Sequence, residues 1–336
     1  MKNGLRLALV YIGLVIGAGF ASGREILQYF NLPSATDQSG IVIATFLFMA
    51  VCYVILYRSY TFGINSFNDY LSCITGKFSK IFSVIIYIYL FCGFFTMFAG
   101  SGALIEQSFM KPSILGIFLM AFICFVTLSF NLKGIVALNM ILVPCMIISI
   151  LYISFASVFR ELETSAFSIQ TKNIILSSIL YVSYNTLSAP AVLVPLQKGL
   201  SPTGITAASV FGGFVLGILI MVIWFAQSLN MDILLNSQIP MLHLAAILGK
   251  SQKQLYSIIL FMSICTTAVS QGFGLMEYFN CKTSKARVMF SALLCTAALP
   301  FSLIKFSALV EKLYGFFGLV GLLWMILIFV DFYRKG

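Results

Sequence analysis

The stretch G-A-G-F-A-S-G-R-E, from Gly17 to Glu25, lies inside an apolar run that extends from Leu5 to Phe30. A run of this length suits a helix that crosses a bilayer, which needs about 20 apolar residues. Three glycines in seven residues weaken a helix interior, and the charges of Arg24 and Glu25 directly after them are costly in hydrocarbon. The sequence therefore predicts a membrane span that is interrupted near its middle.

The composition extends this interpretation to the whole chain. Of its 336 residues, 60% are hydrophobic and 9% are charged, and the mean hydropathy is +1.04. A soluble domain carries about 25% charged residues, so this chain lacks the polar surface of a soluble globule. The apolar runs are continuous rather than alternating, which excludes the strands of a membrane barrel. We expect an all-α polytopic protein that lies in the lipid bilayer.

The apolar runs predict about ten transmembrane helices. The predicted spans are 5–30, 40–60, 79–108, 113–131, 134–158, 173–196, 205–228, 254–279, 286–304 and 308–332. An odd number of spans in each half means that the second half enters the membrane from the opposite side. We therefore predict a single membrane domain of two inverted five-helix repeats, 1–158 and 173–332. Between the spans 205–228 and 254–279, segment 229–253 is expected to carry a short helix on the membrane surface.

The net charge of +10 does not indicate a nucleic-acid partner. The basic residues form short clusters between apolar spans, and more of them, Arg58 included, fall in loops on the side of the N-terminus. The positive-inside rule then predicts that both termini are cytoplasmic. The spans hold no set of acid, base and nucleophile, so an enzyme is not expected.

The first interruption predicts a binding site. A break at Gly17, Gly19 and Gly23 frees carbonyl groups that suit a cation such as Na⁺ and amides that suit a carboxylate. The alternative is helix packing through glycine pairs spaced four residues apart. Packing does not explain Arg24 and Glu25, since charges at such depth face a cavity or a partner.

Two further acidic residues are the nearest candidate partners of these charges. Glu106 ends the third span and Glu311 precedes the tenth. We predict that Arg24, Glu25, Glu106 and Glu311 form a gate, with Arg24 and Glu25 at the start of the outer half of the first span. The alternative is that Arg24 and Glu25 reach an outer vestibule.

A second interruption occurs in the sixth span, in S-Y-N-T-L-S-A-P-A from Ser183 to Ala191. Pro190 prevents a regular helix. The polar groups beside it are those of Tyr184, Asn185, Thr186 and Ser188. Paired breaks in corresponding spans indicate a binding site at the membrane midplane. The alternative is a proline kink in which the hydroxyls repair lost backbone bonds.

The eighth span places three hydroxyls on one helix face. Ser263, Thr266 and Thr267 are spaced i, i+3 and i+4. Such a face could coordinate a hard cation. Hydroxyls in membrane helices also bond their own backbone, and that alternative stays open.

The motif of the first span resembles a known family. G-L-V-I-G-A-G, from Gly13 to Gly19, is similar to the unwound first helix of the amino acid–polyamine–organocation superfamily, whose LeuT-type fold is a five-plus-five inverted repeat. The longer phrase I-G-A-G-F-A-S-G-R-E-I, from Ile16 to Ile26, resembles the YkvI-type bacterial membrane proteins within that superfamily. The resemblance implies a multi-pass protein of the bacterial cytoplasmic (inner) membrane.

The resemblance also implies ligands. A Na⁺ coupling ion, with no other cofactor, would be bound by Gly13, Ile16, Ser263, Thr266 and Thr267. The solute would be bound by Gly17, Ala18, Gly19, Tyr184, Asn185, Thr186 and Ser188. The fifth span lacks the lysine that replaces sodium in some proton-coupled relatives, which favours Na⁺ over H⁺. Phe20 and Ala21 depart from the polar residues of some relatives and leave the substrate class open.

The sequence thus predicts a secondary active transporter of a small solute, an amino acid or related carboxylate. Coupling to Na⁺ (or H⁺) would occur by symport and alternating access, with spans 1, 2, 6 and 7 rocking against the rest. The alternative is an amino-acid-sensing membrane subunit of a receptor complex, similar to germinant receptors, without transport. The sequence gives no indication of an oligomeric state.

Overall fold

The computed structural model describes residues 2–30, 35–130, 139–159, 173–235, 237–279, 281 and 283–335. Within these ranges the chain forms helices and no strands. The first half contains α1 (Lys2–Val15), α2 (Ala18–Ser22), α3 (Arg24–Tyr29), α4 (Ala35–Thr61), α5 (Phe67–Thr75), the 3₁₀ turn η1 (Gly76–Phe78), α6 (Ser79–Phe109), α7 (Ser113–Ser129) and α9 (Asn139–Val158).

The second half is also helical. It contains α10 (Ile174–Thr186), α11 (Ala189–Leu196), α12 (Pro202–Ser228), α13 (Met231–Leu234), α14 (Pro240–Leu248), α15 (Lys250–Tyr278), α16 (Ser284–Ser302), α17 (Phe306–Leu309), the π-helical turn η2 (Val310–Tyr314) and α18 (Gly315–Lys335). A helix pairs most of its backbone groups within itself, which suits a segment in hydrocarbon.

Six helical segments in the described part of the chain are long and apolar enough to cross a membrane. The pair α10 and α11, bent by 54°, forms a seventh as a broken span. The apolar helices at Gly4–Val15 and Ser113–Ser129 are shorter. The multi-pass architecture and the interruptions of the first and sixth spans are confirmed, whereas the count of ten stays a prediction.

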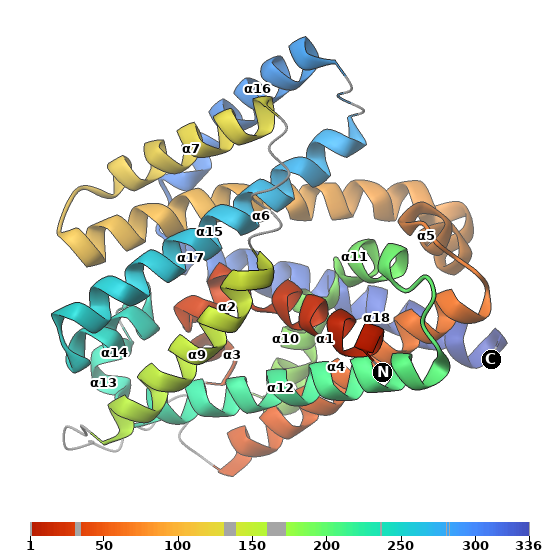
Figure 1. Ribbon diagram of the computed structural model, residues 1–336, viewed down its shortest axis with the longest axis horizontal. Coiled ribbons are helices and arrows are strands. Elements are labelled where there is room, and N and C mark those ends of the chain that lie inside the picture. The colour runs from red at the N-terminus through yellow and green to blue at the C-terminus, as the bar shows by residue number, and fades with distance from the viewer. Residues whose placement is uncertain are drawn as a thin grey trace.

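The helices fall into two groups that lie on opposite sides of the centre (Figure 1). Helices α6, α7, α15 and α16 pack on one another in the upper half of the view. Helices α1, α4, α10 and α12 pack together below them, and α18 lies against α10. Helix α9 contacts both groups through α12 and α15. The short helices α2 and α3 lie between the groups.

Small residues bring α6 and α7 close together. A Cβ on Gly116 would overlap the carbonyl oxygen of Ser101, so only glycine permits this approach. The Ser101 hydroxyl donates to the Gly116 carbonyl over 2.9 Å. Close backbone contact with an interhelical hydrogen bond is how membrane helices associate without a hydrophobic driving force.

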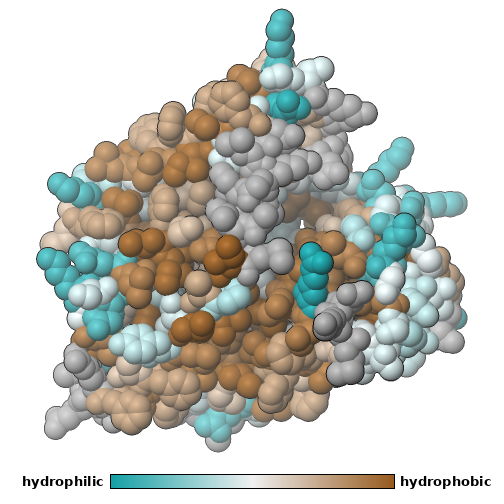
Figure 2. All heavy atoms as spheres, viewed as in Figure 1, coloured by the Kyte–Doolittle hydropathy of each residue, from teal (hydrophilic) through white to brown (hydrophobic). Residues whose placement is uncertain are grey.

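The surface in Figure 2 is mostly hydrophobic, and hydrophilic side chains gather toward the left and right edges, where the long helices end. Large apolar side chains such as Phe118, Phe122, Met289 and Leu293 are exposed on α7 and α16. A soluble protein rarely exposes so much apolar surface, whereas a lipid-facing one must.

Two elements differ from the sequence prediction. Helix α5 lies in a segment that we predicted as a loop, and Ser66 caps it by accepting from the amide of Asp69 over 3.1 Å. Helix α14, expected on the membrane surface, buries Met241 and Leu244 and packs against α9 and α15. The surface-helix prediction was wrong because the apolar face of α14 is covered by protein rather than by lipid.

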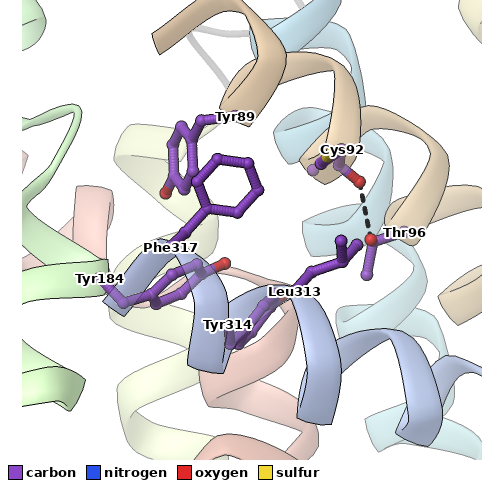
Figure 3. A pocket seen from close by; sticks show the side chains of 8 residues that line it. Tyr89, Cys92, Thr96, Tyr184, Leu313, Tyr314 and Phe317 are labelled. Carbon is purple, nitrogen blue, oxygen red and sulfur yellow. Dashed lines mark hydrogen bonds between the residues drawn. The ribbon is translucent and has the colours of Figure 1, made fainter. Parts of the chain in front are cut away.

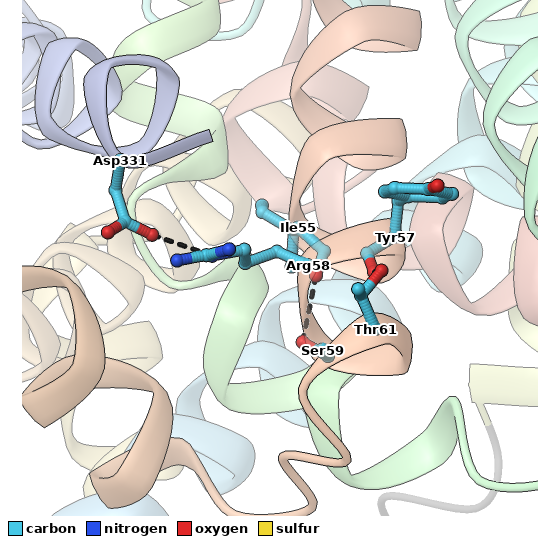
Figure 4. A network of polar contacts seen from close by, with 6 residues as sticks. All are labelled: Ile55, Tyr57, Arg58, Ser59, Thr61 and Asp331. Carbon is cyan, nitrogen blue, oxygen red and sulfur yellow. Dashed lines mark hydrogen bonds and ion pairs between the residues drawn. The ribbon is translucent and has the colours of Figure 1, made fainter. Parts of the chain in front are cut away.

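A buried ion pair joins the ends of α4 and α18 (Figure 4). Arg58 Nε lies 2.7 Å from Asp331 Oδ2, and the two side chains are 3% and 9% exposed. The Arg58 guanidinium also lies 3.8 Å from the centre of the Phe62 ring. Arg58 therefore lies inside the protein rather than in a loop.

Candidate functional site

The first interruption consists of two turns in the chain. Helix α1 ends at Val15, Gly17 is extended with φ −86° and ψ −173°, and Gly23 separates α2 from α3 in the left-handed region with φ 76°. Side chains satisfy part of the freed backbone: the Ser22 hydroxyl donates to Gly19 O, and the Gln227 amide donates to Gly23 O over 2.9 Å. The break is thus stabilised from within the protein.

The second interruption separates α10 from α11 at Leu187 and Ser188. The Thr186 hydroxyl donates to Val182 O over 2.7 Å, and the Asn185 amide donates to Tyr181 O over 3.0 Å. These bonds are the local repair that a kinked membrane helix needs. The side chain of Thr186 is therefore occupied by its own helix.

The two interruptions meet inside the protein. Helix α3 packs against α10 and against η2. The Glu25 carboxylate, 3% exposed, lies beside Gly19, where an added Cβ would overlap Glu25 Oε1. The Asn185 amide is within hydrogen-bonding reach of that carboxylate. Residues from both broken spans thus share one buried polar centre.

Tyr89, Tyr184 and Tyr314 lie close together at a narrow pocket (Figure 3), and the Tyr314 hydroxyl lies 3.0 Å from the position of an ideal Cβ on Gly19. The rings of Tyr184 and Tyr314 stack with centroids 4.0 Å apart, and the Tyr89 ring contacts Tyr184 edge-on. Together with Thr96 on α6 they line a pocket that is too narrow to hold a water molecule. Any solute that binds here requires these aromatic side chains to separate.

No family-level sequence profile matches the chain. The protein YyaD of Bacillus subtilis (strain 168) is 30% identical over 333 residues, which cover 96% of this chain and 94% of YyaD. The chain belongs to the YyaD family. A second relative of this family, the membrane protein YkvI of the same organism, is 27% identical over 94% of this chain and 92% of its own length. Both relatives are described as uncharacterized.

Solved structures show the fold of this YyaD-family protein. The inward-facing conformation of Mhp1 superposes with a TM-score of 0.63 at 15% identity, over 95% of this chain and 73% of Mhp1. A manganese transporter of Eremococcus coleocola matches with a TM-score of 0.51 at 13% identity, over 98% of this chain and 85% of the transporter. The YyaD-family fold is therefore LeuT-type, as the motif of the first span predicted.

The predicted sodium ligands lie partly together in this YyaD-family protein. An ideal Cβ on Gly17 would lie 3.9 Å from the Thr267 hydroxyl, so α15 faces the first break at that point. The Thr266 hydroxyl instead donates to the Ser263 carbonyl over 3.1 Å. Gly13 lies against Val143 of α9. Ile16 is buried in the same region. The sodium site stays a prediction.

The predicted gate residues point in different directions. Arg24 Nη1 donates to Ser237 O over 3.2 Å, and Glu311 is exposed on η2 without an ion pair to Arg24 among the described residues. Glu106 is exposed on α6. Glu25 instead faces inward with the predicted solute-binding residues. Arg24 and Glu25 are the first residues of α3, as expected. Their side chains lie in different surroundings because adjacent positions of a helix point in different directions.

Sequence reasoning missed Tyr89 and Tyr314. Tyr89 lies within an apolar helix and Tyr314 follows the charged pair Glu311 and Lys312, and nothing in either local pattern distinguishes the tyrosine from a packing residue. The position of both rings beside Tyr184 of the broken span is visible only in the structure.

Proposed function

We propose that this YyaD-family protein is a secondary active transporter. Its cargo is a small carboxylate-bearing solute such as an amino acid, and Na⁺ or H⁺ drives it by alternating access. The solute binds between Gly17–Gly19 and Tyr184–Ser188, and Thr267 contributes to the ion site.

One observation carries the proposal: two interrupted helices bring their broken ends to the same buried polar centre. Irregular backbone at membrane depth is tolerated where it lines a cavity or lies buried in protein, and transporters use it to bind solutes and ions. The separation of α1, α4, α10 and α12 from α6, α7, α15 and α16 supports motion of one group against the other.

The structural neighbours are consistent with transport. The protein from Eremococcus coleocola is a manganese transporter of the same fold. Its identity to this chain is 13%, which does not assign manganese as the cargo here. Manganese uptake is therefore measured as one part of the test below.

Uptake by purified protein in liposomes tests the proposal. We expect one or more of the twenty labelled amino acids to accumulate when a Na⁺ or a pH gradient is imposed, and Mn²⁺ uptake is measured in parallel. If Na⁺ is the coupling ion, Thr267→Val abolishes the sodium dependence, because it removes the hydroxyl that faces Gly17.

The matched control is Thr296→Val. Thr296 is exposed on α16, and its hydroxyl donates to Ala292 O of the same helix. Uptake by the Thr296→Val variant is therefore expected to keep its dependence on sodium. Ligand-dependent thermal stabilisation without any flux would contradict transport and favour a sensing subunit. Uptake of Mn²⁺ alone would contradict the solute class.

A further inference from the structure

Glu25 has an unusual position for an acidic side chain. Its residue is 3% exposed, and its Oε2 atom is buried without a hydrogen-bond partner among the described residues. A buried carboxylate that keeps its charge is strongly disfavoured unless it is paired and fully hydrogen-bonded. Glu25 therefore has to be neutralised in this buried position.

No basic side chain neutralises it. Glu25 forms no ion pair with any described residue. Its neighbour Arg24 is directed at the carbonyls of Leu235 and Ser237. The two adjacent charges thus belong to different surroundings, and only that of Glu25 is buried at the helix breaks.

The elements packed against α3 supply mainly hydroxyl and amide groups. Helix α10 supplies Asn185, Tyr181 and Tyr184, and η2 supplies Tyr314. Helix α12 supplies no titratable side chain, and α14 carries one histidine, His243, which is half-buried. The remaining titratable groups near Glu25 are Tyr29 of α3 itself and Tyr89 of α6.

Two of these hydroxyl groups, like the Oε2 atom of Glu25, are buried without a hydrogen-bond partner in the described part of the chain. Tyr29 and Tyr181 pack with ring centroids 5.3 Å apart, and both hydroxyls are buried without a partner among the described residues. Phenol hydroxyls and an amide exchange hydrogen bonds readily with a carboxyl group. Hard metal cations instead favour several carboxylate and carbonyl oxygens around them.

We propose that Glu25 is a proton-binding residue of the transport cycle, an inference that rests on the proposed transporter and assigns H⁺ as a coupling ion. The carboxylate takes a proton from water on one side of the membrane when the site opens there. It holds the proton as a carboxylic acid while the site is closed, and it returns the proton to water on the other side. Gly19 supplies the space that the acid occupies.

Infrared spectroscopy of the full chain in lipid tests this assignment without a known solute. We expect carboxylic-acid C=O absorption at neutral pH that shifts in D₂O and disappears in Glu25→Gln. Glu106→Gln is the matched control, since Glu106 is exposed and its loss leaves the absorption unchanged. Should Glu25→Gln fail to fold, Glu25→Asp keeps an acid in a new place and is expected to shift the absorption.

Two results would overturn the proton site. One is the absence of any Glu25-dependent acid absorption at neutral pH. The other is loss of that absorption on adding NaCl or KCl at constant pH, which would make Glu25 a metal-cation ligand. Vesicle uptake driven by a pH gradient, reduced to background in Glu25→Gln, provides the functional support.

The two proposals fail separately. Sodium-driven uptake without acid absorption would remove the proton site and leave the transporter standing. Acid absorption at Glu25 without uptake of any amino acid or Mn²⁺ would remove the transporter and leave a titrating carboxyl group.

Discussion

Glu25 and Asp331 are both buried carboxylates, 3% and 8% exposed, yet their surroundings differ completely. Asp331 lies 2.7 Å from the guanidinium of Arg58 and links the ends of α4 and α18. Glu25 lies between two broken helices among tyrosines and an amide, with no basic partner in the described chain. The paired carboxylate connects two helices, whereas the unpaired one is available for a ligand.

This difference distinguishes an acidic residue that stabilises the fold, Asp331, from one that is available for function, Glu25. Breaking a buried ion pair leaves an uncompensated charge, so such pairs are sensitive to the loss of one member. An unpaired acid at membrane depth is a functional group by default, because nothing in the fold requires its charge.

The largest effect is expected from Arg58→Met. Removing the guanidinium leaves Asp331 buried without its arginine and should cost about 3–5 kcal/mol of unfolding free energy. Denaturant unfolding in detergent, followed by tryptophan fluorescence, measures it. The double variant Arg58→Met/Asp331→Leu should recover most of the loss. A loss of unfolding free energy below about 1 kcal/mol would mean that the Arg58–Asp331 pair contributes no more than a solvent-exposed ion pair does.

A matched pair of neutral substitutions tests the comparison directly. Asp331→Asn should cost about 1.5–3 kcal/mol because it weakens a charge-assisted bond to Arg58. Glu25→Gln should change stability by less than about 1 kcal/mol, since it removes an acid without a basic partner. The same unfolding assay compares them. Equal costs at the two positions would contradict the distinction.

The space around Glu25 is tested by glycine substitutions. Gly19→Ala places a Cβ in overlap with Glu25 Oε1 and 3.0 Å from the Tyr314 hydroxyl, so about 1–3 kcal/mol should be lost to overpacking. Gly17→Ala meets nothing nearer than Thr267 at 3.9 Å and should cost less than about 1 kcal/mol. Thermal unfolding compares the stability of the two variants. A larger loss for Gly17→Ala than for Gly19→Ala would mean that the Glu25 carboxylate does not lie beside Gly19.

The smallest effect is expected from Tyr29→Phe. Its hydroxyl is buried without a partner, so removing it should change stability by less than about 0.5 kcal/mol, or raise it slightly. Tyr11→Phe is the control. The Tyr11 hydroxyl donates to Phe48 O over 3.0 Å, so its removal should lower the free energy of unfolding by about 1 kcal/mol. A large cost at Tyr29 would reveal a hydrogen bond of its hydroxyl that this structure does not show.

The fold was predictable because its signals are local. The glycines clustered at 17, 19 and 23 and the proline at 190 weaken a helix locally, and apolar runs define spans without tertiary information. Helix α5 also carried a local signal, the Ser66 cap with Asp69 three residues later, that our interpretation passed over.

The candidate site was less predictable because its contacts join distant segments. Arg58 and Asp331 are 273 residues apart, and nothing near Arg58 distinguished it from a loop cation. The direction of Glu25 depends on the left-handed turn at Gly23, which rotates α3 relative to α2. The sequence indicated that a charge lies at the break but not which way it faces.

The tight packing of Tyr184 on Tyr314 has a consequence for the membrane as an electrical barrier. Protons cross hydrocarbon rapidly only along continuous chains of water or hydroxyl groups. A pocket too narrow for one water molecule leaves no room for a chain of water between Tyr184, Tyr314 and Thr96. In this conformation the stacked rings therefore keep a water-filled path from forming through the pocket, which limits leakage of ions while no cargo is bound.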